Sequence, residues 1–100
     1  MTNPLFQQEF PDFDPATLPA IPAGFVDSSW HNDICPSFLD EQRRLQIFID
    51  YADPGEREFP ESRRFRMHRL NEHLEYLDTI ADSDDWNDIV AALASGAQLN

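Results

Sequence analysis

The fold of this 100-residue chain is decided by residues 45–51, LQIFIDY. Apolar and polar side chains alternate along this stretch except at Phe48, and β-branched and aromatic residues are frequent, which is typical of a strand with one buried face. We predict that Phe48 lies on the opposite face of the strand and that the core receives Leu45, Ile47, Ile49 and Tyr51. The rest of the chain must then supply the neighbours of this strand.

Residues 63–80 are the pairing partners that the sequence offers to this strand, because an unpaired strand leaves its backbone N–H and C=O groups without hydrogen bonds. In residues 63–70, Phe65 and Met67 alternate with cations, and residues 71–73 form the expected tip of a hairpin that returns along residues 74–80. An alternative stays open, because residues 61–81 contain no Gly or Pro and their apolar side chains also recur at helical spacing. We favour the two strands.

Proline and turn residues predict the connections on either side of residues 45–51. Pro36 disfavours a helical Cys35 and opens a helix that we expect to run from Ser37 to about Arg44. After the strand, Asp53-Pro54-Gly55 is a strong turn signal.

The C-terminal part of the chain predicts a helix. Ser83 or Asp84 would cap its start, Ser95-Gly96 would end it, and its expected buried face consists of Trp86, Ile89, Val90 and Leu93. The predicted fold class is therefore α+β, a small antiparallel meander of three or four strands packed by the C-terminal helix. An all-α fold is the alternative.

Residues 1–24 contain five prolines, spaced too closely for a long helix or a central strand. We predict an extended arm over residues 1–24 and a single α+β domain over residues 25–100. Apolar side chains lie between the prolines and need to be covered. They would pack on the chain's own domain or dock on a partner, including a second copy in a homodimer; they are Leu5, Phe6, Phe10, Phe13, Leu18 and Ile21.

The net charge of −12 arises from 19 Asp and Glu against seven Arg, with no Lys in the chain. Each half of the sequence carries −6, so the acidity is not confined to a tail. Such a charge repels phosphate backbones, which disfavours direct nucleic-acid binding and favours a protein partner with a basic surface. With one Cys, no basic or apolar leader and no membrane anchor, we expect a cytoplasmic protein.

Four stretches carry a resemblance: WHNDICPSF at residues 30–38, IFIDYADPGERE at 47–58, RRFRMHRL at 63–70 and SDDWNDIVAAL at 83–93. The chain resembles small proteins of proteobacteria and their mobile elements over roughly residues 24–95. That resemblance implies the strand order and the final helix, and it implies no function. In size and charge the chain is similar to phage-encoded inhibitors of the anti-CRISPR type.

His31, Asp33 and Cys35 alternate, so in an extended segment they would share one side, where each is a competent ligand for a divalent metal. Cys35 with His31 could also act as a nucleophile and its base. The sequence offers no second ligand pair and no Gly-rich oxyanion turn. A structural corner, with Trp30 buried as its anchor, therefore explains the stretch better. We assign no catalytic residue, no metal ligand and no cofactor.

Two charged groups are the candidate partner-binding residues. The cations are Arg63, Arg64 and Arg66, and the acids are Asp78, Asp82, Asp84, Asp85 and Asp88. The cations would pair with the chain's own acids or form an interface hot spot, whereas the acids would cap a helix or imitate the phosphates of a nucleic acid.

The expected function is that of an acidic protein-binding module and not an enzyme. Such a module would inhibit a partner, such as a CRISPR effector or a nuclease, by occluding its basic nucleic-acid-binding surface. The alternatives are a small metal- or thiol-dependent enzyme centred on His31, Asp33 and Cys35, and a structural accessory protein that dimerises through its N-terminal Phe residues.

Overall fold

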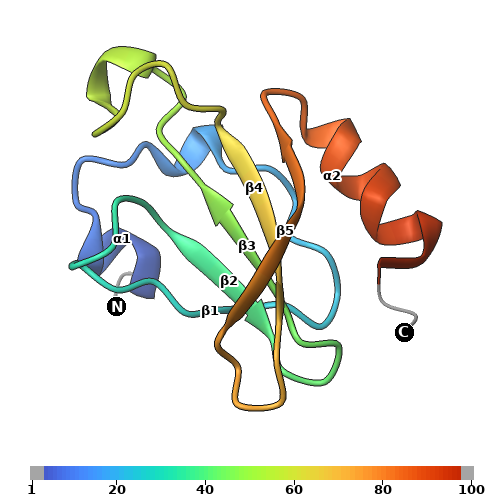
Figure 1. Cartoon of the computed structure of the whole chain (residues 1–100). Helices are drawn as coiled ribbons and strands as arrows, with labels where there is room; N and C mark the ends of the chain where they lie inside the picture. The colour runs from blue at the N-terminus through green and yellow to red at the C-terminus, as the bar shows by residue number, and fades with distance from the viewer. Residues whose placement is uncertain (1–3, 98–100) are drawn as a thin grey trace.

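A computed structural model describes residues 4–97 and contains a five-stranded antiparallel sheet in the order β1-β2-β3-β4-β5 (Figure 1). The α+β prediction is confirmed, with five strands instead of three or four. The strands are β1 (Val26–Asp27), β2 (Ser37–Asp40), β3 (Leu45–Ile49), β4 (Phe65–Leu70) and β5 (Tyr76–Ser83). The helical elements are α1 (Leu5–Glu9), η1 (Pro15–Thr17), η2 (Pro54–Glu56), α2 (Trp86–Ala92) and a π-helical turn, η3 (Leu93–Ala97).

Strand β3 is central, and its alternation is the one that the sequence predicts. Leu45, Ile47 and Ile49 are 0% exposed, whereas Phe48 lies on the other face. In the register, Ile47 lies opposite Phe38 of β2 and Met67 of β4, so the same face of three strands is apolar. Tyr51, just beyond the strand, is partly buried against this core.

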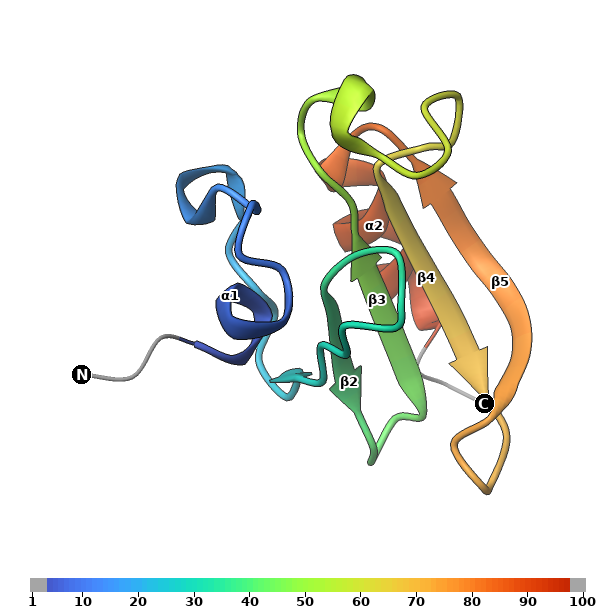
Figure 2. The ribbon, with the colours of Figure 1, turned by 90° about the vertical axis from the view of Figure 1, so that its left-hand side faces the viewer.

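The core lies on one face of the sheet and is closed by two covers (Figure 2). Helix α2 packs on β4 and β5, where Ile89 is fully buried and Trp86 meets Phe65 edge to face at 5.1 Å. The N-terminal arm closes the part near β2 and β3, where the ring of Phe6 lies 6.4 Å from that of Phe38. The opposite face of the sheet receives neither helix.

The arm is not extended throughout, because the helical turn α1 forms between Pro4 and Pro11. Pro4 occupies the N-cap, where its missing N–H costs nothing, and the helix ends at Glu9, before Pro11. Phe6, Phe10 and Phe13 are all buried, so these side chains face the chain's own core. They are not available to a second copy in this arrangement.

The helix predicted from Ser37 to Arg44 is wrong, because Ser37–Asp40 forms β2 and residues 41–44 form the turn into β3. The capping residues favour a helix locally, but the backbone N–H and C=O groups on the free side of β3 need a second strand as a hydrogen-bonding partner. This requirement is the stronger one, so the segment forms a strand. The turn is held by Asp40, which accepts hydrogen bonds from the backbone N–H and the guanidinium of Arg43. Gly24 is required beside it, because its φ is +96° and a Cβ there would lie 2.6 Å from Asp40 Oδ2.

The hairpin over residues 63–80 is confirmed against the single-helix alternative, since β4 and β5 pair along their length with Phe65 opposite Ser83 and Leu70 opposite Tyr76. Asn71 forms the tip by accepting hydrogen bonds from the backbone N–H groups of His73 and Glu75. The register shifts between Met67 and His68 and again between Arg69 and Leu70, which are bulge-like irregularities in the pairing of the edge strand.

The C-terminal helix is confirmed with local differences. Asp85, one residue after Asp84 and two after Ser83, is the N-cap and accepts a hydrogen bond from the Asn87 N–H. Val90 is exposed and Ala92 packs on the core in its place. Ser95-Gly96 does not end the helical path, because the π-helical turn runs through Ala97.

Replacing Phe13 tests whether the arm is an integral part of the core. Its ring lies 5.8 Å from that of Phe6 and 5.3 Å from that of Tyr51, so Phe13→Ala removes a fully buried ring from between two others. We expect a loss of about 3–5 kcal/mol in the free energy of unfolding, measured by urea denaturation. Val26→Ala, at an exposed position of β1, is the control and should change stability by less than about 0.5 kcal/mol. Equal effects of the two substitutions would contradict the packing of the arm.

Candidate functional site

The face of the sheet opposite α2 carries a row of aromatic and polar side chains. Phe48 of β3, His68 of β4 and Tyr76 of β5 form successive ring contacts, with centroids 5.1 Å and 4.7 Å apart. Burial, followed by the charge of Arg66, lowers the pKa of His68, which favours a neutral imidazole in the middle of the row. This face therefore combines ring surfaces with a hydrogen-bonding group.

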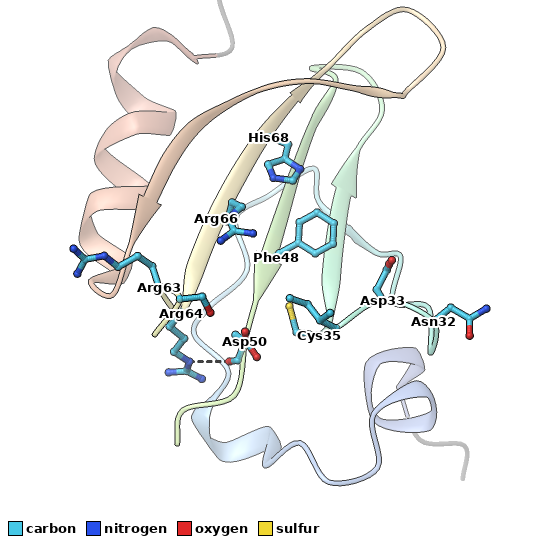
Figure 3. Close-up of a pocket in the computed structure, with 11 residues that line it drawn as sticks. Asn32, Asp33, Cys35, Phe48, Asp50, Arg63, Arg64, Arg66 and His68 are labelled. Atoms are coloured by element: carbon cyan, nitrogen blue, oxygen red, sulfur yellow. Dashed lines mark hydrogen bonds between the residues drawn. The ribbon is translucent and has the colours of Figure 1, made fainter. Parts of the chain in front are cut away.

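A pocket of about 280 Å³ opens beside this row, between β3, β4 and the loop that precedes β2 (Figure 3). Three segments that are distant in sequence build it: the loop at residues 32–35, β3 and its continuation, and residues 62–68 leading into and along β4. The lining residues are Asn32, Asp33, Ile34, Cys35, Phe48, Asp50, Ser62, Arg63, Arg64, Arg66 and His68.

Asp50 is the buried charged group of this pocket, with 3% of its surface exposed. Its Oδ1 accepts one hydrogen bond, from the Tyr51 N–H at 2.8 Å, and no cation forms an ion pair with it within residues 4–97. Burial raises the pKa of Asp50, and the charges of Arg57, Arg66 and Arg64 oppose the shift without contacting the carboxylate. A carboxylate in this state retains acceptor capacity.

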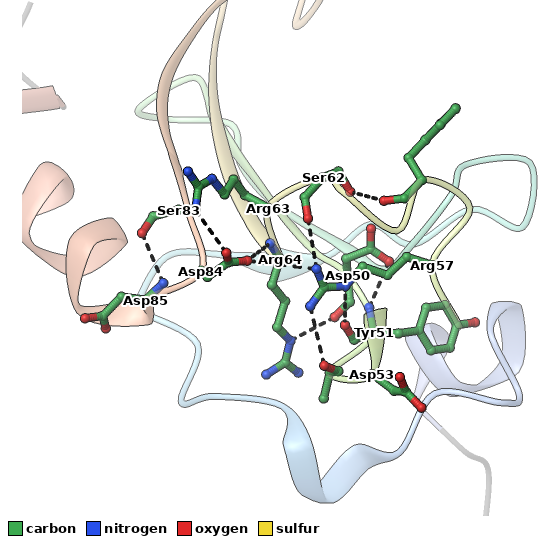
Figure 4. Close-up of polar contacts among 12 residues, drawn as sticks. Asp50, Tyr51, Asp53, Arg57, Ser62, Arg63, Arg64, Ser83, Asp84 and Asp85 are labelled. Atoms are coloured by element: carbon green, nitrogen blue, oxygen red, sulfur yellow. Dashed lines mark hydrogen bonds and ion pairs between the residues drawn. The ribbon is translucent and has the colours of Figure 1, made fainter. Parts of the chain in front are cut away.

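Arg57 and Arg64 behave as structural clamps, because their guanidinium groups donate to backbone carbonyls (Figure 4). Arg64 donates to Asp50 O at 3.0 Å and to Thr17 O at 2.9 Å, and so ties the arm to the end of β3. Arg57 donates to Tyr51 O and Ser62 O, which ties together the two ends of the β3–β4 connection.

Arg66 makes weaker contacts within the described chain than Arg57 and Arg64 do. Its Nε lies 3.7 Å from Asp82 Oδ1, a long ion pair, and within the described chain its guanidinium donates no hydrogen bond. The side chain is about one-third exposed at the mouth of the pocket. It is therefore free to meet an acceptor or an anion that enters from solvent.

Cys35 lies in the wall of the pocket and is 2% exposed. Burial, reinforced by the negative charge of Asp50, raises the pKa of its thiol strongly, so the thiolate is disfavoured. A nucleophilic Cys needs the opposite environment. The geometry thus supports Cys35 as an apolar wall residue.

The structure does not bring His31, Asp33 and Cys35 together, because residues 31–35 form turns and bends instead of an extended segment. His31 points to the arm, where its Nδ1 lies 2.8 Å from Glu9 Oε1, while Asp33 and Cys35 line the pocket. Among residues 4–97, no three His, Cys, Asp or Glu side chains are placed to hold a metal ion. Trp30 is 50% exposed, so the expected buried anchor is wrong.

Three of the predicted acids form ion pairs with arginines of the same chain, two of them with the predicted cations Arg63 and Arg66. Asp78 pairs with Arg69 at 2.6 Å, Asp82 with Arg66 at 3.7 Å and Asp84 with Arg63 at 3.1 Å. Asp84 also accepts from the Arg64 N–H, and these contacts hold its pKa below the ordinary value.

The two remaining acids of the group also have intramolecular roles. Asp85 caps α2, and Asp88 accepts a hydrogen bond from Ser83 Oγ at 2.6 Å. The cross-strand register places Asp78 and Asp82 beside Arg69 and Arg66, whereas the partners of Asp85 and Asp88 are local in sequence.

Sequence reasoning missed the pocket itself. No site role is assigned to Phe48, Asp50 or His68 from the sequence, although the alternation of LQIFIDY sends positions 46, 48 and 50 to the face opposite the core. The available signal for the pocket was Asp50, a charged residue that directly follows a strand with a buried face.

The chain matches no protein-family model, and no curated protein and no solved structure is significantly similar to it. Within residues 4–97, no helix is both long and apolar enough to cross a membrane.

The charge of Asp50 generates a stability prediction. Because burial raises its pKa, the ionised form costs folding free energy above that pKa, and the cost disappears below the ordinary value of 3.8. Asp50→Asn keeps an acceptor for the Tyr51 N–H and carries no charge. The stability of the variant relative to the parent chain should therefore rise between about pH 4 and pH 7, measured by urea unfolding at both values. A difference that stays constant, or moves the other way, would contradict an uncompensated charge at this position.

Proposed function

We propose that the protein is a binding module that docks on a partner protein through the outer edge of β5 and the tip of the β4–β5 hairpin. The observation that carries this proposal is the exposure of large apolar side chains there: Tyr76 is 61% and Leu77 55% exposed, and Leu74 of the tip is next to them. Grouped aromatic and aliphatic side chains of this kind are typical of the centre of an interface.

The position of β5 in the sheet also supports this strand as the docking surface. β5 is an eight-residue strand at the edge of the sheet, with β4 on one side and no strand of the described chain on the other. Its outward N–H and C=O groups can pair with an extended segment of a partner, a common mode of protein recognition. Figure 2 shows β5 along the border of the sheet, beside β4.

The negative charge of the protein favours a partner with a basic surface. Glu72 and Glu75 are exposed around the apolar tip, and the whole chain carries −12, which speeds encounter with a positively charged surface. We extend the proposal to a partner that binds nucleic acid, such as a nuclease or a CRISPR effector, which the module would inhibit by covering its basic channel. The similarity in size and charge to phage-encoded inhibitors supports this extension.

The internal ion pairs change how such inhibition would work. Asp78, Asp82 and Asp84 are already paired with arginines, so a patch of free phosphate-like charges at β5 and α2 is not the main attraction. An apolar centre at the tip of the hairpin with a surrounding negative field is the better description of the docking surface.

Affinity capture with matched variants tests the proposal. The immobilised parent chain, a Tyr76→Ala/Leu77→Arg double variant and the control Val26→Ala, at an exposed site of the other edge strand, are incubated with proteobacterial lysate. We expect basic nucleic-acid-binding proteins on the parent and the control but not on the double variant. They should be released at about 0.5 M salt, where screening reduces electrostatic reach to roughly 4 Å.

Retained proteins are then assayed for nucleic-acid binding or cleavage with and without the parent chain. Inhibition by the parent chain that is lost in the double variant supports the inhibitory role. Retention of the same proteins by the double variant, or retention of acidic proteins that ignore salt, would contradict the proposed surface.

A further inference from the structure

The pocket beside Phe48 adjoins the β5 docking surface at the ring contact between His68 and Tyr76, but its buried carboxylate calls for an occupant of different chemistry. Its polar end is the Asp50 carboxylate, which is almost fully buried, accepts a single hydrogen bond and has no ion pair within the described residues. Buried polar groups are normally satisfied, so a group with unused acceptor capacity at the base of a cavity indicates a hydrogen-bond donor supplied from outside.

The charges around Asp50 determine which kind of hydrogen-bond donor is suitable for its carboxylate. Arg57, Arg64 and Arg66 all act electrostatically on Asp50, although none contacts its carboxylate. A cationic ligand would be repelled by these three guanidinium groups, whereas a neutral N–H donor would satisfy the carboxylate without that penalty. Arg66, at the mouth, has donors to spare and would attract an anionic substituent of the same ligand.

The walls define the shape of the ligand. The phenyl ring of Phe48 and the imidazole of His68 lie on one side, and the apolar side chains of Ile34 and Cys35 contribute to the lining (Figure 3). Ring surfaces favour a planar ligand that stacks on them. A volume of about 280 Å³ is at the lower end of small-molecule pockets and suits one fused ring system with a small substituent.

We propose that this pocket binds a free purine mononucleotide with the hydrogen-bonding pattern of guanine. Guanine presents a ring N–H beside an exocyclic amino group, two adjacent neutral donors that match the oxygens of Asp50, and its ring stacks on Phe48. The phosphate meets Arg66 at the mouth of the pocket. Adenine has no ring N–H on that edge and fits the carboxylate less well.

A titration followed by NMR tests this assignment. The ¹⁵N-labelled full chain is titrated with guanosine monophosphate, adenosine monophosphate and guanosine. We expect saturable shifts confined to the amides of residues 32–35, 48–50 and 62–68. Adenosine monophosphate should bind about tenfold more weakly or worse, since it leaves the carboxylate unpaired, and guanosine should bind more weakly because it lacks the phosphate.

Variants identify the groups responsible. Asp50→Asn should weaken binding of guanosine monophosphate about tenfold or more, and Arg66→Gln should abolish the preference for the phosphorylated ligand over guanosine. Phe48→Leu, which removes the stacking surface and leaves the carboxylate intact, is the second test in case Asp50→Asn alters the fold. Asp78→Asn, in the exposed ion pair with Arg69, is the control and should bind as the parent does.

A further titration distinguishes the binding of a free nucleotide from the binding of a base within a nucleic-acid strand. A single-stranded trinucleotide with a central guanine should bind more weakly than guanosine monophosphate, because its additional phosphates meet the net charge of −12. The proposal is overturned if no nucleotide causes saturable shifts in the pocket, if Asp50→Asn and Phe48→Leu both bind as the parent does, or if the trinucleotide binds more tightly.

Discussion

The two-residue period of β3 is the constraint on which the rest of the structure depends. Because Leu45, Ile47 and Ile49 face the core, Gln46, Phe48 and Asp50 must face the other way. One face of the sheet thus packs against α2 and the Phe-rich arm and stabilises the fold. The other face carries the ring row and the buried carboxylate, so the strand that organises the core also delivers the most unusual group of the candidate site.

Charge in this protein is used first for architecture. Arg57 and Arg64 hold backbone carbonyls around the pocket, and the arginines of β4 face the acids of β5. Asp50 is the exception, since it is buried and has no cationic partner within residues 4–97. Keeping an ionisable group there costs stability, a cost expected at functional sites more than in a structural core.

Sequence reasoning could predict what depends on local period and turn chemistry: the β3 strand, the hairpin at Asn71 and the C-terminal helix. It failed at Ser37–Asp40, where capping residues indicated a helix but the free side of β3 required a strand. Pairing of the arginines with the chain's own acids and capping of the helix by an acid were both expected alternatives, but which residues pair, Arg66 with Asp82 and Arg69 with Asp78, depends on the register between β4 and β5. Asp50 was a local signal for one wall of the pocket, but the other walls come from two distant segments and could be placed only by the tertiary structure. The exposure of Trp30 likewise follows from tertiary packing.

The carboxylate of Asp50 is buried in a pocket and has no ion-pair partner among residues 4–97. The direct measurement is the pKa of Asp50 in the intact chain, followed through its ¹³Cγ chemical shift in an NMR titration. A pKa above the ordinary value of 3.8 is the predicted result, because burial outweighs the more distant arginines. A pKa at or below that value would show that a cation or water already satisfies the carboxylate, and would contradict the account.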